Sequence, residues 1–144
     1  MKLKITCLCP KGKAGEAIIT FEKYLSLVKK PIESKIINEE SFHFVYDCKD
    51  DRELAIFTTQ KIPKTVKRIR DTYWLIIHIV SRANKLISNG NWAAEKALKW
   101  ANKMFEKKTQ KEDVDKFFKD INLEDKDKFI EFLNKEIISW EVLE

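Results

Sequence analysis

The sequence has few of the residues on which common functional sites depend. Three of its 144 residues are cysteines, Cys7, Cys9 and Cys48, and this sparse, odd set argues against the disulfide framework of small secreted domains. Only two residues are histidines. The Gly-x-Ser-x-Gly, His-Glu-x-x-His, Walker A and dinucleotide-binding motifs are all absent. The sequence therefore carries no catalytic signature, and it favours a protein that has no cofactor and is not an enzyme.

Long apolar segments are missing as well. The most apolar run, residues 73–80, is too short to cross a bilayer and has charged residues on both sides. Residues 1–6 enter a strand pattern at once, without the apolar segment of a signal peptide. No linker rich in Pro, Gly or Ser occurs near residue 90. We therefore expect a cytoplasmic protein with no membrane partner, folded as a single domain over residues 1–144.

Glutamine is rare, because it occurs only at positions 60 and 110, whereas lysine and isoleucine are heavily used. This bias is typical of heat-adapted proteins, although an AT-rich genome produces it too. The net charge of +5 is distributed unevenly. Residues 1–90 contain 17 basic and 10 acidic side chains, and residues 91–144 contain 11 and 13. A basic front half with a mildly acidic back half is a hint of a binding partner and identifies no particular one.

The hydrophobic pattern predicts an α+β fold. Alternation predicts strands over residues 2–9, 32–37, 41–48 and 53–59, and the short turns between the last three favour antiparallel pairing. Residues 16–30 have helical spacing, with a strand over residues 17–25 as the alternative. The expected architecture is a small mixed or antiparallel sheet of about four strands, in the order β-α-β-β-β-α, followed by a helical C-terminal part. Residues 1–62 would then be mainly sheet with one helix, and residues 63–144 helical.

Four helices are predicted in that second part. Pro63 is placed to open the longest, over residues 64–89, and Gly90 to end it. A second helix is expected over residues 91–107. A third begins at the capping-box sequence starting at Thr109 and has the inner face Val114, Phe117, Phe118 and Ile121. The last is expected from Asp125 to about Trp140.

A cluster of basic residues at the start of the long helix is the first candidate site. Its members are Lys61, Lys64, Lys67, Arg68 and Arg70. A helix N-terminus adds free N–H groups and a positive dipole end to such charges. The cluster therefore predicts contacts with phosphates.

Lysines and tryptophans share one side of the following helix, and they are the second candidate site. The residues are Trp92, Lys96, Lys99, Trp100 and Lys103. Single-stranded nucleic acid binds to such surfaces, because rings stack on bases while ammonium groups neutralise the backbone. The alternative is that both rings cover the edge of the core beneath lysine stems. Because the two basic features are on consecutive helices, we expect them to share a surface.

The polar face of the long helix is a third, weaker candidate. Asp71, His78 and Arg82 fall on one lengthwise face, where His78 could act as a general base. The alternative is a solvated helix face that carries a histidine.

Two metal hypotheses are disfavoured. Cys7, Cys9, His43 and Cys48 lack the usual spacing of zinc ligands, because His43 and Cys48 would point to opposite faces of a strand. Residues 120–131 resemble a calcium loop in part, but Asp125 stands where the turn needs glycine. We therefore expect no metal site.

Together these features predict a small intracellular accessory protein that binds DNA or RNA through the basic helix start and the Trp/Lys helix face. One alternative is a protein-interaction or structural accessory protein, or a homo-oligomer, using the C-terminal helices. A second alternative is an enzyme that uses the face of Asp71, His78 and Arg82.

Overall fold

The computed structural model describes residues 1–25, 29–108 and 123–143. The chain begins with β1 (Lys2–Leu8), α1 (Ala14–Leu25), β2 (Glu33–Asn38) and β3 (Ser41–Asp47). A continuous helix of 38 residues follows, made of α2 (Asp51–Ile56), the π-helical turn η1 (Phe57–Lys61) and α3 (Ile62–Ser88). The remaining elements are α4 (Ala94–Lys108), the 3-10 turn η3 (Leu123–Asp125), α5 (Lys126–Leu133) and β4 (Ile138–Leu143).

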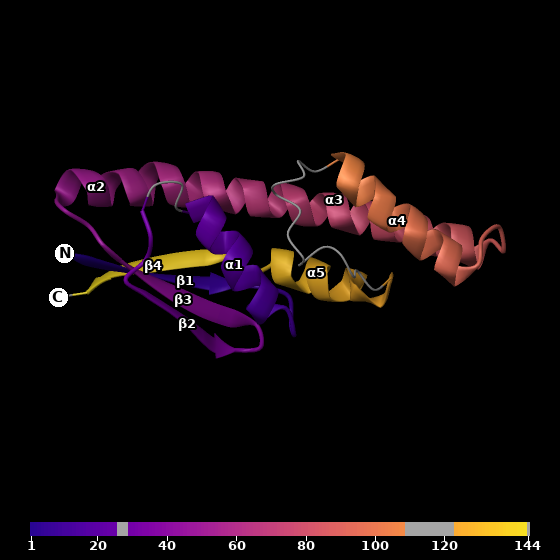
Figure 1. Cartoon of the computed structure of the whole chain (residues 1–144), viewed down its shortest axis with the longest axis horizontal. Helices are drawn as coiled ribbons and strands as arrows, with labels where there is room; N and C mark the ends of the chain where they lie inside the picture. Colours follow the sequence, from indigo (N-terminus) through magenta and orange to yellow (C-terminus); the bar gives the residue numbers. More distant parts are fainter. Residues whose placement is uncertain (26–28, 109–122, 144) are drawn as a thin grey trace.

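The four strands form one antiparallel sheet in the order β2-β3-β1-β4 (Figure 1). The α+β class and an antiparallel sheet of four strands are therefore confirmed, but the predicted order β-α-β-β-β-α is wrong, because the fourth strand comes from the C-terminal segment. Apolar side chains of β1 and β3 point to one face, which α1 and the long helix cover. Phe21 of α1 packs on Phe42, and Phe57 of the long helix packs on Tyr46, with ring centroids 5.0 Å apart in both pairs.

Several local predictions are confirmed. Strands occupy most of residues 2–9, 32–37 and 41–48, and the helical interpretation of residues 16–30 holds for α1, so the strand alternative is wrong. Gly90 has a φ of 72°, which is the left-handed conformation expected after a helix end. In each case the local pattern and the tertiary packing agree.

The predicted strand over residues 53–59 is wrong, because these residues are helical. Asp50 caps the helix, since its side chain accepts a hydrogen bond of 2.9 Å from the Glu53 N–H. Pro63 consequently lies inside a helix that began twelve residues earlier, at Asp51. The π-helical turn precedes this proline, and the Ile62 N–H bonds to the Phe57 carbonyl, which widens the helix where proline removes a donor. Pro63 is therefore not a helix start.

The predicted last helix, from Asp125 to about Trp140, is also wrong in its second half. Its inner face is correct for Phe129, Phe132 and Leu133, which are all buried. The helix ends at Leu133, however, and Ile138–Leu143 forms β4 beside β1. Residues 63–144 are therefore not wholly helical. The helix predicted to begin at Thr109 lies outside the described residues.

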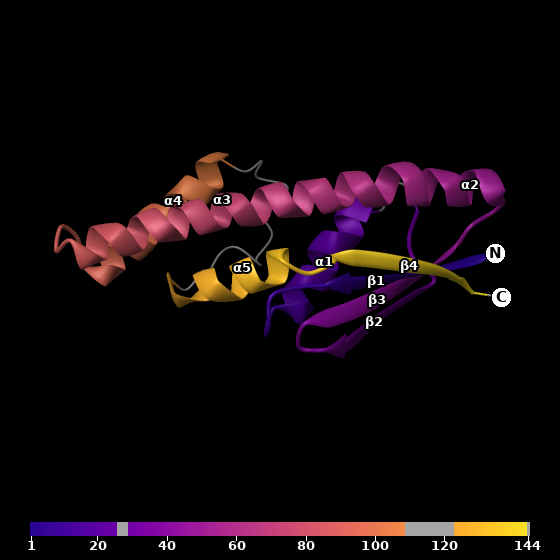
Figure 2. The ribbon, with the colours of Figure 1, turned by 180° about the vertical axis from the view of Figure 1, so that it is seen from behind.

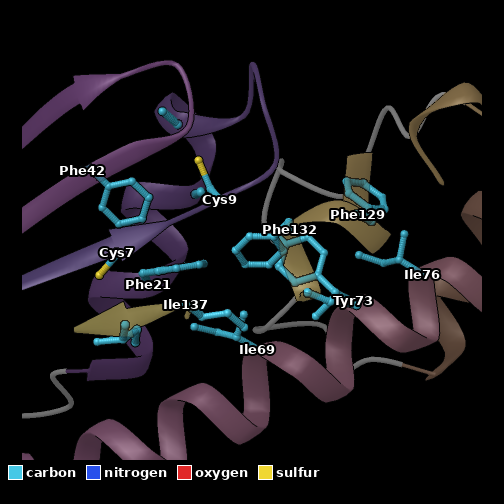
Figure 3. Packing of buried hydrophobic residues seen from close by; sticks show 14 of the residues in the cluster. Cys7, Cys9, Phe21, Phe42, Ile69, Tyr73, Ile76, Phe129, Phe132 and Ile137 are labelled. Atoms are coloured by element: carbon cyan, nitrogen blue, oxygen red, sulfur yellow. The ribbon is translucent and has the colours of Figure 1, made fainter. Parts of the chain in front are cut away.

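The long helix extends beyond the sheet, and α4 and α5 pack against this extension (Figures 1 and 2). Tyr73 of α3 lies between Phe129 and Phe132 of α5, with ring centroids 5.3 and 4.9 Å away (Figure 3). The same buried cluster continues through Ile69 and Ile137 to Phe21 and the sheet. Among the described residues, no helix is both long enough and apolar enough to span a membrane.

Candidate nucleic-acid interface and a groove at the sheet edge

The basic residues around Pro63 do not sit at a helix N-terminus, so the dipole argument for this site fails. Three of them, Lys61, Lys64 and Arg68, line one pocket of about 280 Å³ with Tyr24 of α1. The guanidinium of Arg68 lies 4.5 Å from the centroid of the Tyr24 ring. Such a cation–π contact holds the arginine in place beside the ring. The structure thus brings together three of the five predicted residues.

The other two predicted residues, Lys67 and Arg70, do not line this pocket. Arg70 donates hydrogen bonds to the carbonyls of Leu133 (2.8 Å) and Lys135 (3.3 Å), where α5 ends. The Lys67 ammonium lies 3.5 Å from the Asp71 carboxylate, one helical turn away. Arg70 therefore has a structural role that the sequence did not indicate, since its partners are more than 60 residues further along the chain.

A wider basic surface follows the exposed side of the long helix. Asp71 is the sole carboxylate in the sequence between Glu53 and Glu95. At a rise of 1.5 Å per residue, the distance from residue 61 to residue 85 is about 36 Å. The cations along it that are at least partly exposed, apart from Arg70 with its bonds to the end of α5, define what we call the basic ridge: Lys61, Lys64, Lys67, Arg68, Arg82 and Lys85.

The third candidate, the face of Asp71, His78 and Arg82, is exposed along the same helix. His78 lies beside Trp74, with ring centroids 6.3 Å apart. Asp71 lines the groove described below, but neither His78 nor Arg82 does. Because a general base needs a concave site that orients its substrate, this geometry does not favour the enzyme hypothesis.

The tryptophans of the second candidate contact each other. Trp92 and Trp100 form an edge-to-face pair with centroids 5.8 Å apart, and the Lys96 ammonium lies 5.0 Å from the centroid of Trp92. Both rings are partly buried against the core, and Lys99 pairs with Glu95 at 3.6 Å. This arrangement fits the alternative interpretation, in which the rings cover the core edge. Lys103 is exposed on the same helix.

The two basic features do not share one compact surface. The Trp92 N–H bonds to the Leu86 carbonyl, so this ring lies at the far end of the long helix. Leu86 is about 24 Å along the helix from Arg70 at 1.5 Å per residue. A ligand that contacts both must therefore be long.

The three cysteines are buried free thiols. Burial is the main cause that raises the pKa of Cys9, to about 12, and it raises the pKa of Cys7 and Cys48 as well. Thiolate is the nucleophilic and metal-binding form, so these residues are unreactive at neutral pH. His43 instead lies 3.2 Å from Glu33. Within the described residues, no three His, Cys, Asp or Glu side chains gather as metal ligands would.

Sequence reasoning missed a groove of about 720 Å³ between the long helix and β4. Figure 2 shows β4 running beside this helix. Isoleucine and tryptophan side chains and both charge signs line the groove, and the lining residues include Ile62, Lys67, Asp71, Trp74, Glu136 and Trp140. The alternation Ile138, Trp140, Val142 was the signal for a strand, but the preceding helical pattern was extended over it.

Comparison with known proteins does not assign a function to this chain. No family model, no curated protein and no solved structure matches the chain. Function must therefore be argued from the surfaces themselves.

Proposed function

We propose that this protein is a nucleic-acid-binding accessory protein whose basic ridge contacts the phosphates of DNA or RNA. The observation that supports this proposal is the charge distribution along the long helix. Six cations span about 36 Å with one carboxylate among them. A phosphate backbone is a linear array of negative charge. It therefore matches an extended row of cations better than a small, compact anion does.

The ridge would act through counterion release. The positive charges of the ridge are at the ends of long side chains, which can follow a phosphate backbone without a fixed register. These side chains belong to Lys61, Lys64, Lys67, Lys85, Arg68 and Arg82. Base-specific contacts are not implied, since phosphate contacts position a ligand without reading its sequence. Lys99 and Lys103 of α4 would extend the contact along a long ligand, whereas stacking of bases on Trp92 and Trp100 stays a prediction.

Titration of single- and double-stranded DNA and RNA into the protein tests the proposal, with tryptophan fluorescence and electrophoretic mobility as readouts. About five phosphate contacts predict a loss of affinity of two to three orders of magnitude between 50 and 200 mM salt. The triple substitution Lys61→Glu, Lys64→Glu and Arg68→Glu should abolish binding.

The matched control reverses three lysines on the sheet, Lys2, Lys4 and Lys35, all to glutamate. These residues belong to β1 and β2 and lie away from the ridge, so the net charge changes equally but binding should persist. Equal loss in both triple variants would mean that only net charge matters, and the ridge would then have no role. No binding at 50 mM salt would reject the proposal.

A protein-interaction role is the second candidate function. The observation that favours it is the groove beside β4, where Trp74 and Trp140 are each 47% exposed. Large exposed aromatic side chains at a groove are typical of protein interfaces.

A further inference from the structure

The two edge strands of the sheet differ in how they are protected against pairing with another chain. β2 has a break in register between Ile36 and Asn38 and carries the charged residues Glu33 and Lys35. Both features discourage an incoming strand. β4 pairs with β1 in unbroken register over six residues, and it contains no proline, no lysine and one charged residue before its end, Glu141.

The free edge of β4 offers hydrogen-bonding groups from alternate residues. The Leu8 N–H bonds to the Ile137 carbonyl at 2.8 Å, so Ile137 and the residues two and four further on turn their backbone groups toward β1. Ile138, Trp140 and Val142 must therefore turn their N–H and C=O groups outward. In the part of the chain that the structure describes, β4 is an edge strand with nothing paired on that side.

The same three residues place their side chains on the helix-covered face. Trp140 pairs with Ile5 and Val142 pairs with Leu3, and both partners point into the core. Trp140 and Val142 nevertheless remain 47% and 39% exposed, because they lie at the margin of that face. An apolar row with unpaired backbone groups is the feature that an added strand would cover.

The sequence of β4 is complementary to itself in one antiparallel register. Residues whose backbone groups face outward must pair with residues of the same kind in the second copy. Three antiparallel registers near the middle of β4 satisfy this condition. Pairing Trp140 with Trp140 of a second copy also sets Ile138 against Val142 and Ser139 against Glu141. In the register that pairs Trp140 with Val142, the two Glu141 carboxylates lie opposite each other. In the register that pairs Trp140 with Ile138, Val142 has no partner within β4.

We propose that this protein forms a homodimer in which β4 pairs antiparallel with β4 of a second copy, about a two-fold axis at Trp140. The two sheets become one sheet of eight strands, and the helices of both copies lie on the same face. Each groove then opens toward the axis, where Trp74 and Trp140 of the two copies become covered. The proposal does not depend on nucleic-acid binding.

A second copy fits this edge better than an unrelated peptide. The reason is that, within Ile138–Leu143, the self-pairing register sets the one charged residue, Glu141, opposite serine and opposes no two like charges. Two-fold pairing also buries the apolar row on both copies at once, whereas a peptide would need a matching row of its own.

Sedimentation and light scattering of the full chain over a wide concentration range give the first test. Twice the mass of 17.0 kDa is expected at high concentration. Trp140→Lys should weaken dimerisation by about 30-fold or more, as expected for a central aromatic residue of an interface. Val142→Pro should do the same, because it removes an outward N–H and leaves pairing with β1 intact. The matched control is Ile36→Lys on the opposite edge, which should leave the dimer unchanged.

Cysteine crosslinking tests the register. Residues opposed in a pair without mutual hydrogen bonds have Cα atoms about 4.5 Å apart, which suits a disulfide. A mixture of Ser139→Cys and Glu141→Cys chains should therefore crosslink on oxidation, and neither variant should crosslink alone. Crosslinking of either single variant alone would overturn the register.

A monomer at every concentration would overturn the proposal. So would a dimer that Trp140→Lys and Val142→Pro leave intact while circular dichroism shows both variants folded. The reverse pattern, a dimer disrupted by Ile36→Lys alone, would place the interface on β2 and reject β4.

Discussion

β2 and β4 are the two edges of one sheet, yet different forces hold them to the protein. β4 continues from α5, whose Phe129 and Phe132 pack on Tyr73, and Arg70 bonds to the carbonyls between them and the strand. β2 has six exposed residues, and it is held mainly by the ladder to β3, with α1 close by. Near its start, the Lys29 ammonium bonds to the Asp47 carbonyl and to Glu53.

The more firmly anchored edge strand is therefore also the one that exposes apolar side chains at its free edge. The edge that presents exposed apolar residues, β4, is anchored by buried rings and by the hydrogen bonds of Arg70. The edge that is protected from pairing, β2, is held near its start by a half-exposed ion pair. The firmer anchor would keep β4 in place for the pairing with a second copy that we propose.

The largest expected effect is at the anchor of β4. Phe132→Ala removes a buried ring and leaves a cavity beside Tyr73, so it should lower the free energy of unfolding by about 3–5 kcal/mol. Ile37→Ala on β2 is the control, and its exposed side chain predicts a change within about 0.5 kcal/mol. Urea denaturation followed by circular dichroism measures both. Similar losses in the two variants would contradict the proposed difference between the edges.

Loss of the arginine should have the next largest effect. Arg70→Met keeps the aliphatic stem but leaves the carbonyls of Leu133 and Lys135 without their donor, at a cost of about 1.5–3 kcal/mol. Lys67→Met removes an exposed ion pair three residues earlier and should cost less than about 1 kcal/mol. Hydrogen exchange should also show faster opening of β4 in Arg70→Met. If the two substitutions have the same effect, Arg70 does not anchor the strand.

Acid should loosen β2 and leave β4 in place. The hydrogen bond from Lys29 is the main cause that lowers the pKa of Glu53, and the bond from the Lys49 N–H adds to it. A lowered folded-state pKa means that the stabilisation is complete above the unfolded value of about 4.3 and disappears as pH falls through the folded value. Exchange at β2 should therefore accelerate below about pH 4, and Arg70 should hold β4 unchanged.

The smallest effect is expected for Glu53→Gln at neutral pH. It removes the charge of a half-exposed pair and should cost on the order of 0.5 kcal/mol. It should also abolish the acid-dependent change at β2, since Glu53 is the carboxyl group that bonds to Lys29 and whose pKa that bond lowers. An unchanged acid response in this variant would assign the effect to another carboxyl group.

The sequence predicted the parts of the site that depend on composition. The cations around residues 61–70 and Lys99 were identified as basic surface, and most of them are exposed. It could not predict that Arg70 is engaged by Leu133 and Lys135, or that Trp92 and Trp100 contact each other, because these contacts join separate parts of the fold. The groove was missed for the same reason, since it exists where β4 meets the long helix.

Local patterns by themselves determined the central strands, α1, the buried rings of α5 and the stop at Gly90, because each has one period or one backbone requirement that no neighbour opposes. Tertiary structure decided residues 53–59 and 138–143, whose β-branched and aromatic residues suit strand or helix. The capped start at Asp50 and the packing of Phe57 on Tyr46 made the first helical. The second became a strand because β1, more than 130 residues away in sequence, left an unpaired row of backbone groups that only an extended segment could satisfy.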